Sequence, residues 1–375
     1  MTRSTEHPAD QPMPTSGGPN GVAGPNGVAS PNRVAEIDTL IPPALPDITP
    51  LRIAFSNMVS KQWEAHVPIA LGNASGAFTH AQFAKARFIA EMYARACYSM
   101  LLVSADGPML LRWPVEACAT LPLSRGVAIR LGIGLLRGMD WLVPRAVHRQ
   151  LLLMSMLMGI LDIVLDEAAP SGEASVLRIA SLITREAPAN LLPTEQPIAT
   201  LAHVIRRRES AWQSEFWETI LQPAVRNYCL AEALAVTHAP DPAVTGHRWA
   251  GIDAAIKGMW YAIGPRIGLR GSMSRFEQPK WSREQNWMAD TSLLMQMIDD
   301  WVDQDEDRGT RLTPVITGDW DLQSVNGLYS KTIRDLSAML DENGIRSRVM
   351  RQLFVDLYND YLHLALDGMR AGVAE

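Results

Sequence analysis

The chain has 375 residues, of which 47% are hydrophobic and 20% charged, and its formal net charge at pH 7 is −6. This length and apolar content suffice for one large domain or two ordinary ones. The small net charge and the lack of a strongly basic block argue against nucleic acid as the main partner. Three widely spaced cysteines (Cys97, Cys118 and Cys229) favour free thiols and a cytoplasmic, reducing location.

Residues 1–50 are rich in Pro, Gly, Ser and Asn and contain a near-repeat: GPNGVA, GPNGVA, SPNRVA. A segment with so few large apolar side chains cannot offset the entropy lost on ordering, so we predict a disordered tail over 1–50 and one domain over 51–375. There is no apolar signal core and no unbroken apolar run of about 18 residues. We therefore predict neither a signal peptide nor a membrane span.

From about residue 50 onward the apolar residues recur at helical spacing, interrupted by Pro and Gly. We predict helices over 80–103, 110–121, 124–142, 146–167, 192–238 (one long helix, or two with a break near Pro223), 247–267, 282–307, 321–340 and 345–371. No alternating run indicates a strand. Long helices joined by short loops predict an all-α bundle around one core.

The helix predicted over 282–307 begins apolar and ends acidic. Asp299, Asp303 and Asp307 lie at i, i+4 and i+8, so their carboxylates fall on one stripe of the helix. Like charges at this spacing repel, and a Mg²⁺ ion held by the oxygens would offset that repulsion. The alternative is a solvated acidic helix end.

A second pair of carboxylates, Asp162 and Asp166, ends the apolar helix predicted over 146–167. A charged side chain in such a helix is costly unless it is paired or coordinated. A hydrogen-bonded buried Asp explains either residue alone, whereas one shared metal site explains both pairs. Such a site at the mouth of an apolar pocket suits a diphosphate with a hydrocarbon tail. Lys257, Arg308 and Arg311 are basic candidates for binding its head group.

The segment QMIDDWVDQDED resembles the second aspartate-rich motif of trans-isoprenyl diphosphate synthases, FQxxDDxxD. The matching positions are Gln296, Asp299, Asp300 and Asp303. Asp299 follows Asp162 by 137 residues, which suits the distance between the family's two motifs. Lys257 stands where the family usually has a Lys-Thr pair. The resemblance implies the class I isoprenoid synthase bundle around a central apolar pocket, three Mg²⁺ ions with diphosphate bound, a prenyl diphosphate substrate and a possible homodimer. It also implies substrate-binding roles for Gln296 and Asp300.

The departures from the family pattern favour a different reaction. The first motif, DDxxD in the family, reads Asp162-Ile163-Val164-Leu165-Asp166, and the Arg pair after it is absent. The segment that binds isopentenyl diphosphate, GGKRxRP in the family, is reduced to GPMLLRWP, where Arg112 alone is basic. This resembles class I terpene synthases, whose motif (N/D)Dxx(S/T)xxxE is approximated by Asp299, Asp300, Asp303 and Asp307.

We therefore predict a Mg²⁺-dependent class I terpene synthase. Metal would be held by Asp162, Asp166, Asp299, Asp303 and Asp307, of which Asp162, Asp166 and Asp299 are the catalytic residues. Substrate would be bound by Lys257, Arg308, Arg112, Gln296 and Asp300. The alternatives are a chain-elongating trans-prenyltransferase, a non-catalytic subunit of one, and a structural helical scaffold.

Overall fold

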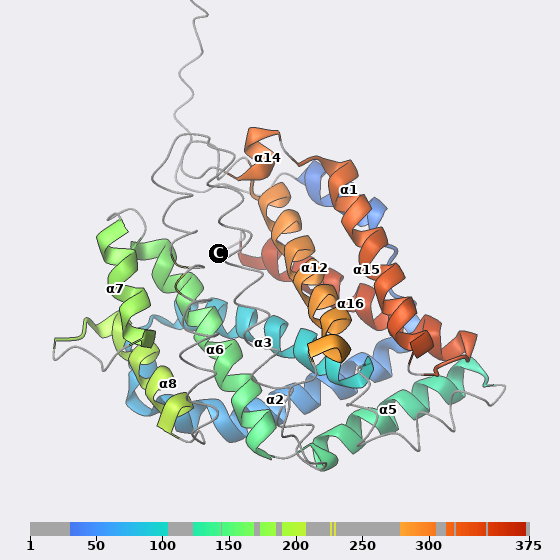
Figure 1. The fold of residues 1–375 in the computed structure, drawn as a ribbon, viewed down its shortest axis with the longest axis horizontal. Helices are drawn as coiled ribbons and strands as arrows, with labels where there is room; N and C mark the ends of the chain where they lie inside the picture. Colours follow the sequence, from blue (N-terminus) through green and yellow to red (C-terminus); the bar gives the residue numbers. More distant parts are fainter. Residues whose placement is uncertain are drawn as a thin grey trace, which may run out of the picture.

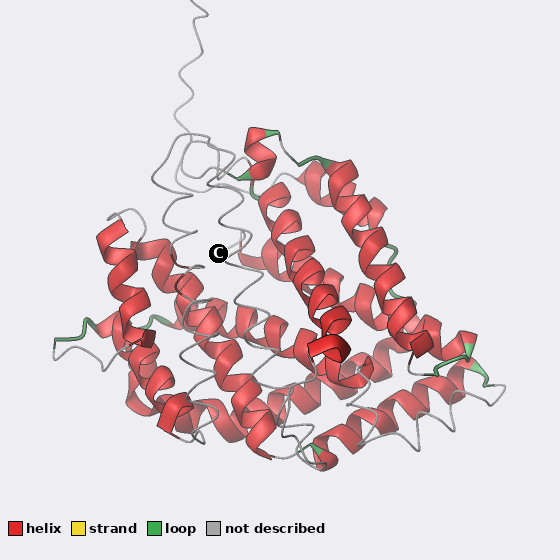
Figure 2. Cartoon of the chain, viewed as in Figure 1, coloured by secondary structure: helices red, strands yellow, loops and turns green. Residues whose placement is uncertain are grey.

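The computed structural model describes residues 31–103, 123–143, 145–168, 173–184, 190–207, 226, 229, 278–304, 313–318, 320–342 and 344–372. Over these residues the chain is predominantly helical and has no strand, which confirms the all-α prediction (Figure 2). Its helices are α1 (Pro31–Leu40), η1 (Pro46–Ile48), α2 (Thr49–Leu71), η2 (Gly72–Ala77), α3 (His80–Val103), α5 (Arg125–Leu142), α6 (Arg145–Ala168), α7 (Glu173–Thr184), η4 (Pro193–Glu195), α8 (Gln196–Arg207), α12 (Gln278–Val302), α14 (Pro314–Thr317), α15 (Leu322–Glu342) and α16 (Arg348–Gly372).

Most of the helices were predicted from the sequence. The helix over 80–103 is confirmed as α3, and α5, α6, α15 and α16 begin and end within three residues of their predicted bounds. The acidic helix α12 ends earlier than predicted, at Val302. The predicted helices over 110–121 and 247–267 lie outside the described residues. Helices α2 and α7 were not predicted, although the buried Val176, Ile179 and Ile183 of α7 follow helical spacing.

The predicted tail over 1–50 is wrong for its last 20 residues. Residues 31–50 contain α1, η1 and the start of α2, and Ile37 and Ile41 are completely buried. Val34, Ile37 and Ile41 share one face of α1, and this face supplies the apolar contacts that the compositional argument overlooked. Residues 1–30 lie outside the described part.

Helix α3 is the centre of the arrangement. It contacts α2 and α6 on one side of the molecule and α12, α15 and α16 on the other (Figure 1). Much of its buried surface is small, with Ala86, Ala90, Ala94 and Cys97 all inaccessible to solvent. Small side chains allow neighbouring helix backbones to approach closely, so α3 can pack against several helices at once.

Gly159 of α6 lies very close to the backbone of α3. A Cβ atom placed on Gly159 would lie 2.2 Å from the backbone oxygen of Ala86 and 3.1 Å from the nitrogen of Ala90. A residue with any side chain therefore cannot occupy this position unless the two backbones move apart. Gly159 lies three residues before Asp162, so this contact also fixes the acidic end of α6.

Helix α6 is buried nearly all round, as its sequence predicts: every residue from 150 to 161 is buried. The stretch Arg145–Leu165 is long and apolar enough to cross a membrane by length and composition. However, 89% of its most apolar window is covered by the rest of the fold, which is typical of a core helix.

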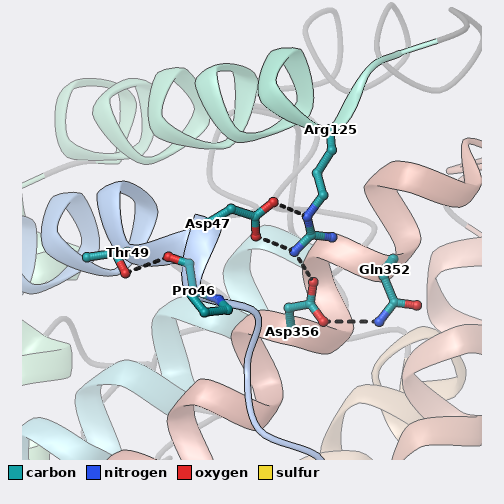
Figure 3. A network of polar contacts seen from close by, with 6 residues as sticks. All are labelled: Pro46, Asp47, Thr49, Arg125, Gln352 and Asp356. Carbon is teal, nitrogen blue, oxygen red and sulfur yellow. Dashed lines mark hydrogen bonds and ion pairs between the residues drawn. The ribbon is translucent and has the colours of Figure 1, made fainter.

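One ion-pair network joins three segments that are far apart in sequence (Figure 3). Arg125, at the start of α5, donates to both carboxylate oxygens of Asp47 in η1 and, at 2.7 Å, to Oδ2 of Asp356 in α16. Gln352 donates to the other oxygen of Asp356 at 3.0 Å. Hydrogen bonding and the charge of Arg125 hold the pKa of Asp47 below its ordinary value, although burial opposes this. Asp356 is only 3% exposed, so Arg125 neutralises a buried charge.

Replacement of Gly159 tests the close packing of α3 and α6. We expect Gly159→Ala to lower the free energy of unfolding by roughly 1–3 kcal/mol, since its Cβ would overlap the α3 backbone. Gly134→Ala is the matched control, because nothing lies within 4 Å of its added Cβ on α5. It should raise stability by about 0.5–1 kcal/mol through helix propensity. Urea unfolding measures the stability of both variants. Equal effects of Gly159→Ala and Gly134→Ala would contradict the close approach of α6 to α3.

Removal of Arg125 tests the network. We expect Arg125→Met to lower the free energy of unfolding by roughly 1–3 kcal/mol, because it leaves the buried Asp356 carboxylate without its cation. Arg130→Met, at an exposed position of the same helix, should change it by less than about 0.5 kcal/mol. Adding Asp356→Leu to Arg125→Met should restore part of the loss. Thermal and urea unfolding would contradict the network if the double variant were the least stable.

Candidate functional site

The acidic end of α12 follows directly from a buried apolar face. Leu294, Ile298 and Val302 are at most 1% exposed and anchor the helix in the core. The backbone N–H of Asp303 donates to the carbonyl oxygen of Asp299 at 2.9 Å, which continues the helical pattern past Val302. Asp299 and Asp303 are therefore one turn apart and both are half-buried, as the spacing predicts.

The neighbouring residue Asp300 has a different environment. It is 2% exposed, and its Oδ1 accepts a hydrogen bond from Nε2 of Gln296 at 2.9 Å. Both residues were predicted to bind substrate. Their mutual hydrogen bond lies within α12 and Asp300 is buried; their role in substrate binding stays a prediction.

The end of α12 is also held from outside the helix. Nη1 of Arg33 in α1 lies 3.5 Å from the carbonyl oxygen of Trp301, and its guanidinium carbon lies 5.9 Å from the centre of the Trp301 ring. Nε2 of Gln304 donates to the carbonyl oxygen of Val315 in α14 at 3.3 Å. Sequence reasoning missed Arg33 because it was assigned to the tail; the apolar face of α1 was the available signal.

Helix α6 carries the other predicted carboxylates. Asp162 is half-buried, whereas the next three residues, Ile163, Val164 and Leu165, are buried. Asp166 lies in the last turn of α6, and its side chain lies outside the described part. From 150 to 165, Asp162 is therefore the single residue that is not buried.

The acidic ends of α6 and α12 lie on the same side of the molecule, toward α7 and α14 respectively (Figure 1). Helix α3 contacts both helices, α6 and α12. Among the described residues, no three His, Cys, Asp or Glu side chains lie close enough together to hold a metal ion. Asp307, Lys257, Arg308 and Arg112, which were predicted to complete the site, lie outside the described residues. The structure thus brings Asp299 and Asp303 together, but in the described part it does not gather them with Asp162 into one metal-binding group.

A second polar cluster, not predicted from the sequence, lies near the start of α6. His148 is 1% exposed, and its Nδ1 lies 2.7 Å from the hydroxyl oxygen of Tyr98 in α3. Asp140, at the end of α5, accepts hydrogen bonds from Lys61 and Gln62 of α2. Burial lowers the pKa of His148 to about 4, against the opposing field of Asp140. His148 is therefore neutral near pH 7 and suits a structural role between α3 and α6.

Comparison with known proteins gave no match: no family model, no curated protein and no solved structure is similar to this chain.

The low pKa of His148 predicts a pH-dependent loss of stability. In the unfolded chain a His titrates near 6.5, so between pH 6.5 and about 4 the unfolded state binds a proton that the folded state does not. The free energy of unfolding should fall as pH drops through this range, by up to roughly 3 kcal/mol. In His148→Gln this fall should shrink. His80→Gln, at the exposed start of α3, should leave it unchanged. Urea unfolding between pH 7 and pH 4 measures this fall for the wild type and both variants. If the free energy of unfolding fell equally steeply with pH in all three, His148 would not be its source.

Proposed function

We propose that the chain is a Mg²⁺-dependent enzyme of the class I terpene synthase type, built on the isoprenoid synthase bundle. It would ionise one allylic prenyl diphosphate and release diphosphate. The observation that carries the proposal is the end of α12, where Asp299 and Asp303 lie one turn apart at the end of a core-anchored helix, within a motif that resembles the second aspartate-rich motif. The acidic end of α6 on the same side of the molecule supports it (Figure 1).

The donors have the chemistry of a Mg²⁺ site, although among the described residues Asp162 does not lie close enough to Asp299 and Asp303 to form one metal-binding group with them. Asp162, Asp299 and Asp303 offer carboxylate oxygens, the ligands that Mg²⁺ prefers, and all three are half-buried, neither inaccessible nor fully solvated. In the proposed site, Asp166 and Asp307 would complete the ligand set. When bound, Mg²⁺ would supply positive charge that stabilises the departing diphosphate.

The chain's own residues would then have separate tasks. Lys257, Arg308 and Arg112 would bind the diphosphate oxygens, and Asp300 with Gln296 would hold the end of α12. The allylic carbon–oxygen bond breaks with both electrons leaving on diphosphate, and the resulting allyl cation ends by losing a proton to give a hydrocarbon. An apolar pocket would exclude water until that step.

Neutralising single carboxylates tests the proposal. Asp162→Asn and Asp299→Asn should each reduce Mg²⁺-dependent diphosphate release by more than about 100-fold, because each removes a charged metal ligand. Asp290→Asn is the matched control on α12: Asp290 pairs with Lys331 on α15, more than two turns before the acidic end, and its loss should leave turnover near that of the wild type. Release is measured with geranyl, farnesyl and geranylgeranyl diphosphate, with and without Mg²⁺.

Circular dichroism and urea unfolding verify that each variant is folded. Turnover of Asp162→Asn at the wild-type rate would show that α6 does not contribute to the site. Release only when isopentenyl diphosphate is added, with a longer diphosphate as product, would replace the proposal by chain elongation. No release from the wild type under any condition would reject both enzymatic functions.

A further inference from the structure

The structure contains a pocket at the opposite end of α6 from Asp162. It has a volume of about 410 Å³ and lies between α2, the first turns of α6, and α8. Arg145, which borders it, precedes Asp162 by 17 residues, which places the pocket about 25 Å along the helix from the acidic end. This volume falls in the range of small-molecule sites, and the pocket belongs to no part of the proposed function.

The lining combines a cationic side with an apolar floor. Arg145 and Arg149 of α6 and His66 of α2 supply the basic groups, while Ile69 of α2 and Val204 of α8 are among the apolar contacts. Arg145 and Arg149 are one turn apart and so lie on one face of α6. Burial, followed by the positive charges of Arg149 and Arg145, lowers the pKa of His66, which is consistent with both arginines lying near its ring.

The two arginines stand at an unfavourable place on their helix. The first turn of α6 contains no acidic residue, and cations at a helix N-terminus oppose the helix dipole. Arg145 and Arg149 also repel each other at i, i+4. Within the described residues, Arg145 and His66 make no ion pair or hydrogen bond, and the Nε2 atom of His66 is inaccessible to solvent. An anion beside Arg145 and Arg149 would offset both the adverse helix dipole and the repulsion between the two arginines.

We propose that this pocket binds an amphiphilic anion: a phosphate head group between Arg145, Arg149 and His66, with a short hydrocarbon tail against Ile69 and Val204. The basic side supplies charge-assisted hydrogen bonds and the start of α6 supplies its dipole. The tail would cover Ile69, which is 80% exposed in the structure, the highest value among its exposed large aliphatic side chains. Burial of such a side chain is favourable by the hydrophobic effect.

Titration calorimetry with octyl phosphate as the probe tests the proposal. We expect one site per chain, with weaker or no binding of inorganic phosphate, which lacks the tail, and of octyl glucoside, which lacks the charge. Arg145→Gln and Arg149→Gln should each weaken binding by about tenfold, the value of one charge-assisted hydrogen bond. Arg137→Gln, at an exposed position of α5, is the matched control and should bind as the wild type does.

Ile69→Asp supplies a second test that is independent of the arginines. Because Ile69 is exposed, the change should leave the fold intact while its carboxylate repels the probe, so binding should be lost. Ile53→Asp changes another exposed isoleucine of α2, 53% exposed and away from the pocket, and should have no effect. Neither readout requires catalytic activity.

Three outcomes would overturn the proposal. Octyl glucoside could bind as well as octyl phosphate, which would show a non-specific apolar surface. Ile69→Asp and both arginine variants could bind octyl phosphate as the wild type does, which would place the ligand elsewhere. The chain could bind vesicles containing phosphatidic acid, and not phosphatidylcholine vesicles, while ignoring free octyl phosphate, which would indicate a membrane-docking surface.

Discussion

The close approach of α3 and α6 at Gly159 is the constraint on which the rest of the structure depends. Among the described helices, α3 contacts α2, α6, α12, α15 and α16, so the depth at which α6 packs against α3 affects where α6 lies relative to the others (Figure 1). Only a residue without a side chain allows the backbone oxygen of Ala86 to lie this near. Because Asp162 follows one turn later, the same contact determines where the acidic end of α6 emerges from the core.

Helix α6 carries its charges in the reverse of the stable order. Its first turns are basic and its last turns acidic, whereas the helix dipole favours acids at the start and bases at the end. Each adverse charge costs roughly 0.3–1 kcal/mol, while each buried Leu or Met contributes roughly 1.5–3 kcal/mol. Every residue from 150 to 161 is buried, so the stabilisation from packing outweighs the cost of the adverse charges at the two ends of the helix. The helix can therefore keep charge of the unfavourable sign at both ends, where ligands of opposite charge would bind.

The sequence predicts local structure well where one pattern dominates. The helix over 80–103 and the burial of α6 both follow from apolar spacing, and both are confirmed. Helix α1 was missed because composition outweighed the spacing of Val34, Ile37 and Ile41, whose burial depends on the distant helix α12 that α1 contacts. The spacing of Asp299 and Asp303 predicts one turn of separation within a helix. It cannot predict their distance from Asp162, because that distance is set by how α6 and α12 each pack on α3.

Helical geometry also explains why the two adjacent aspartates of the α12 motif differ. Consecutive residues of a helix point about 100° apart, so Asp299 and Asp300 cannot both face one site. The structure leaves Asp299 half-buried beside Asp303 and buries Asp300 against Gln296. The same geometry applies on α6, where Ile163, the residue after Asp162, is 5% exposed. A charged side chain at position 163 would therefore face the core, while Asp162 and Asp166, one turn apart, have the spacing of a carboxylate pair on one face.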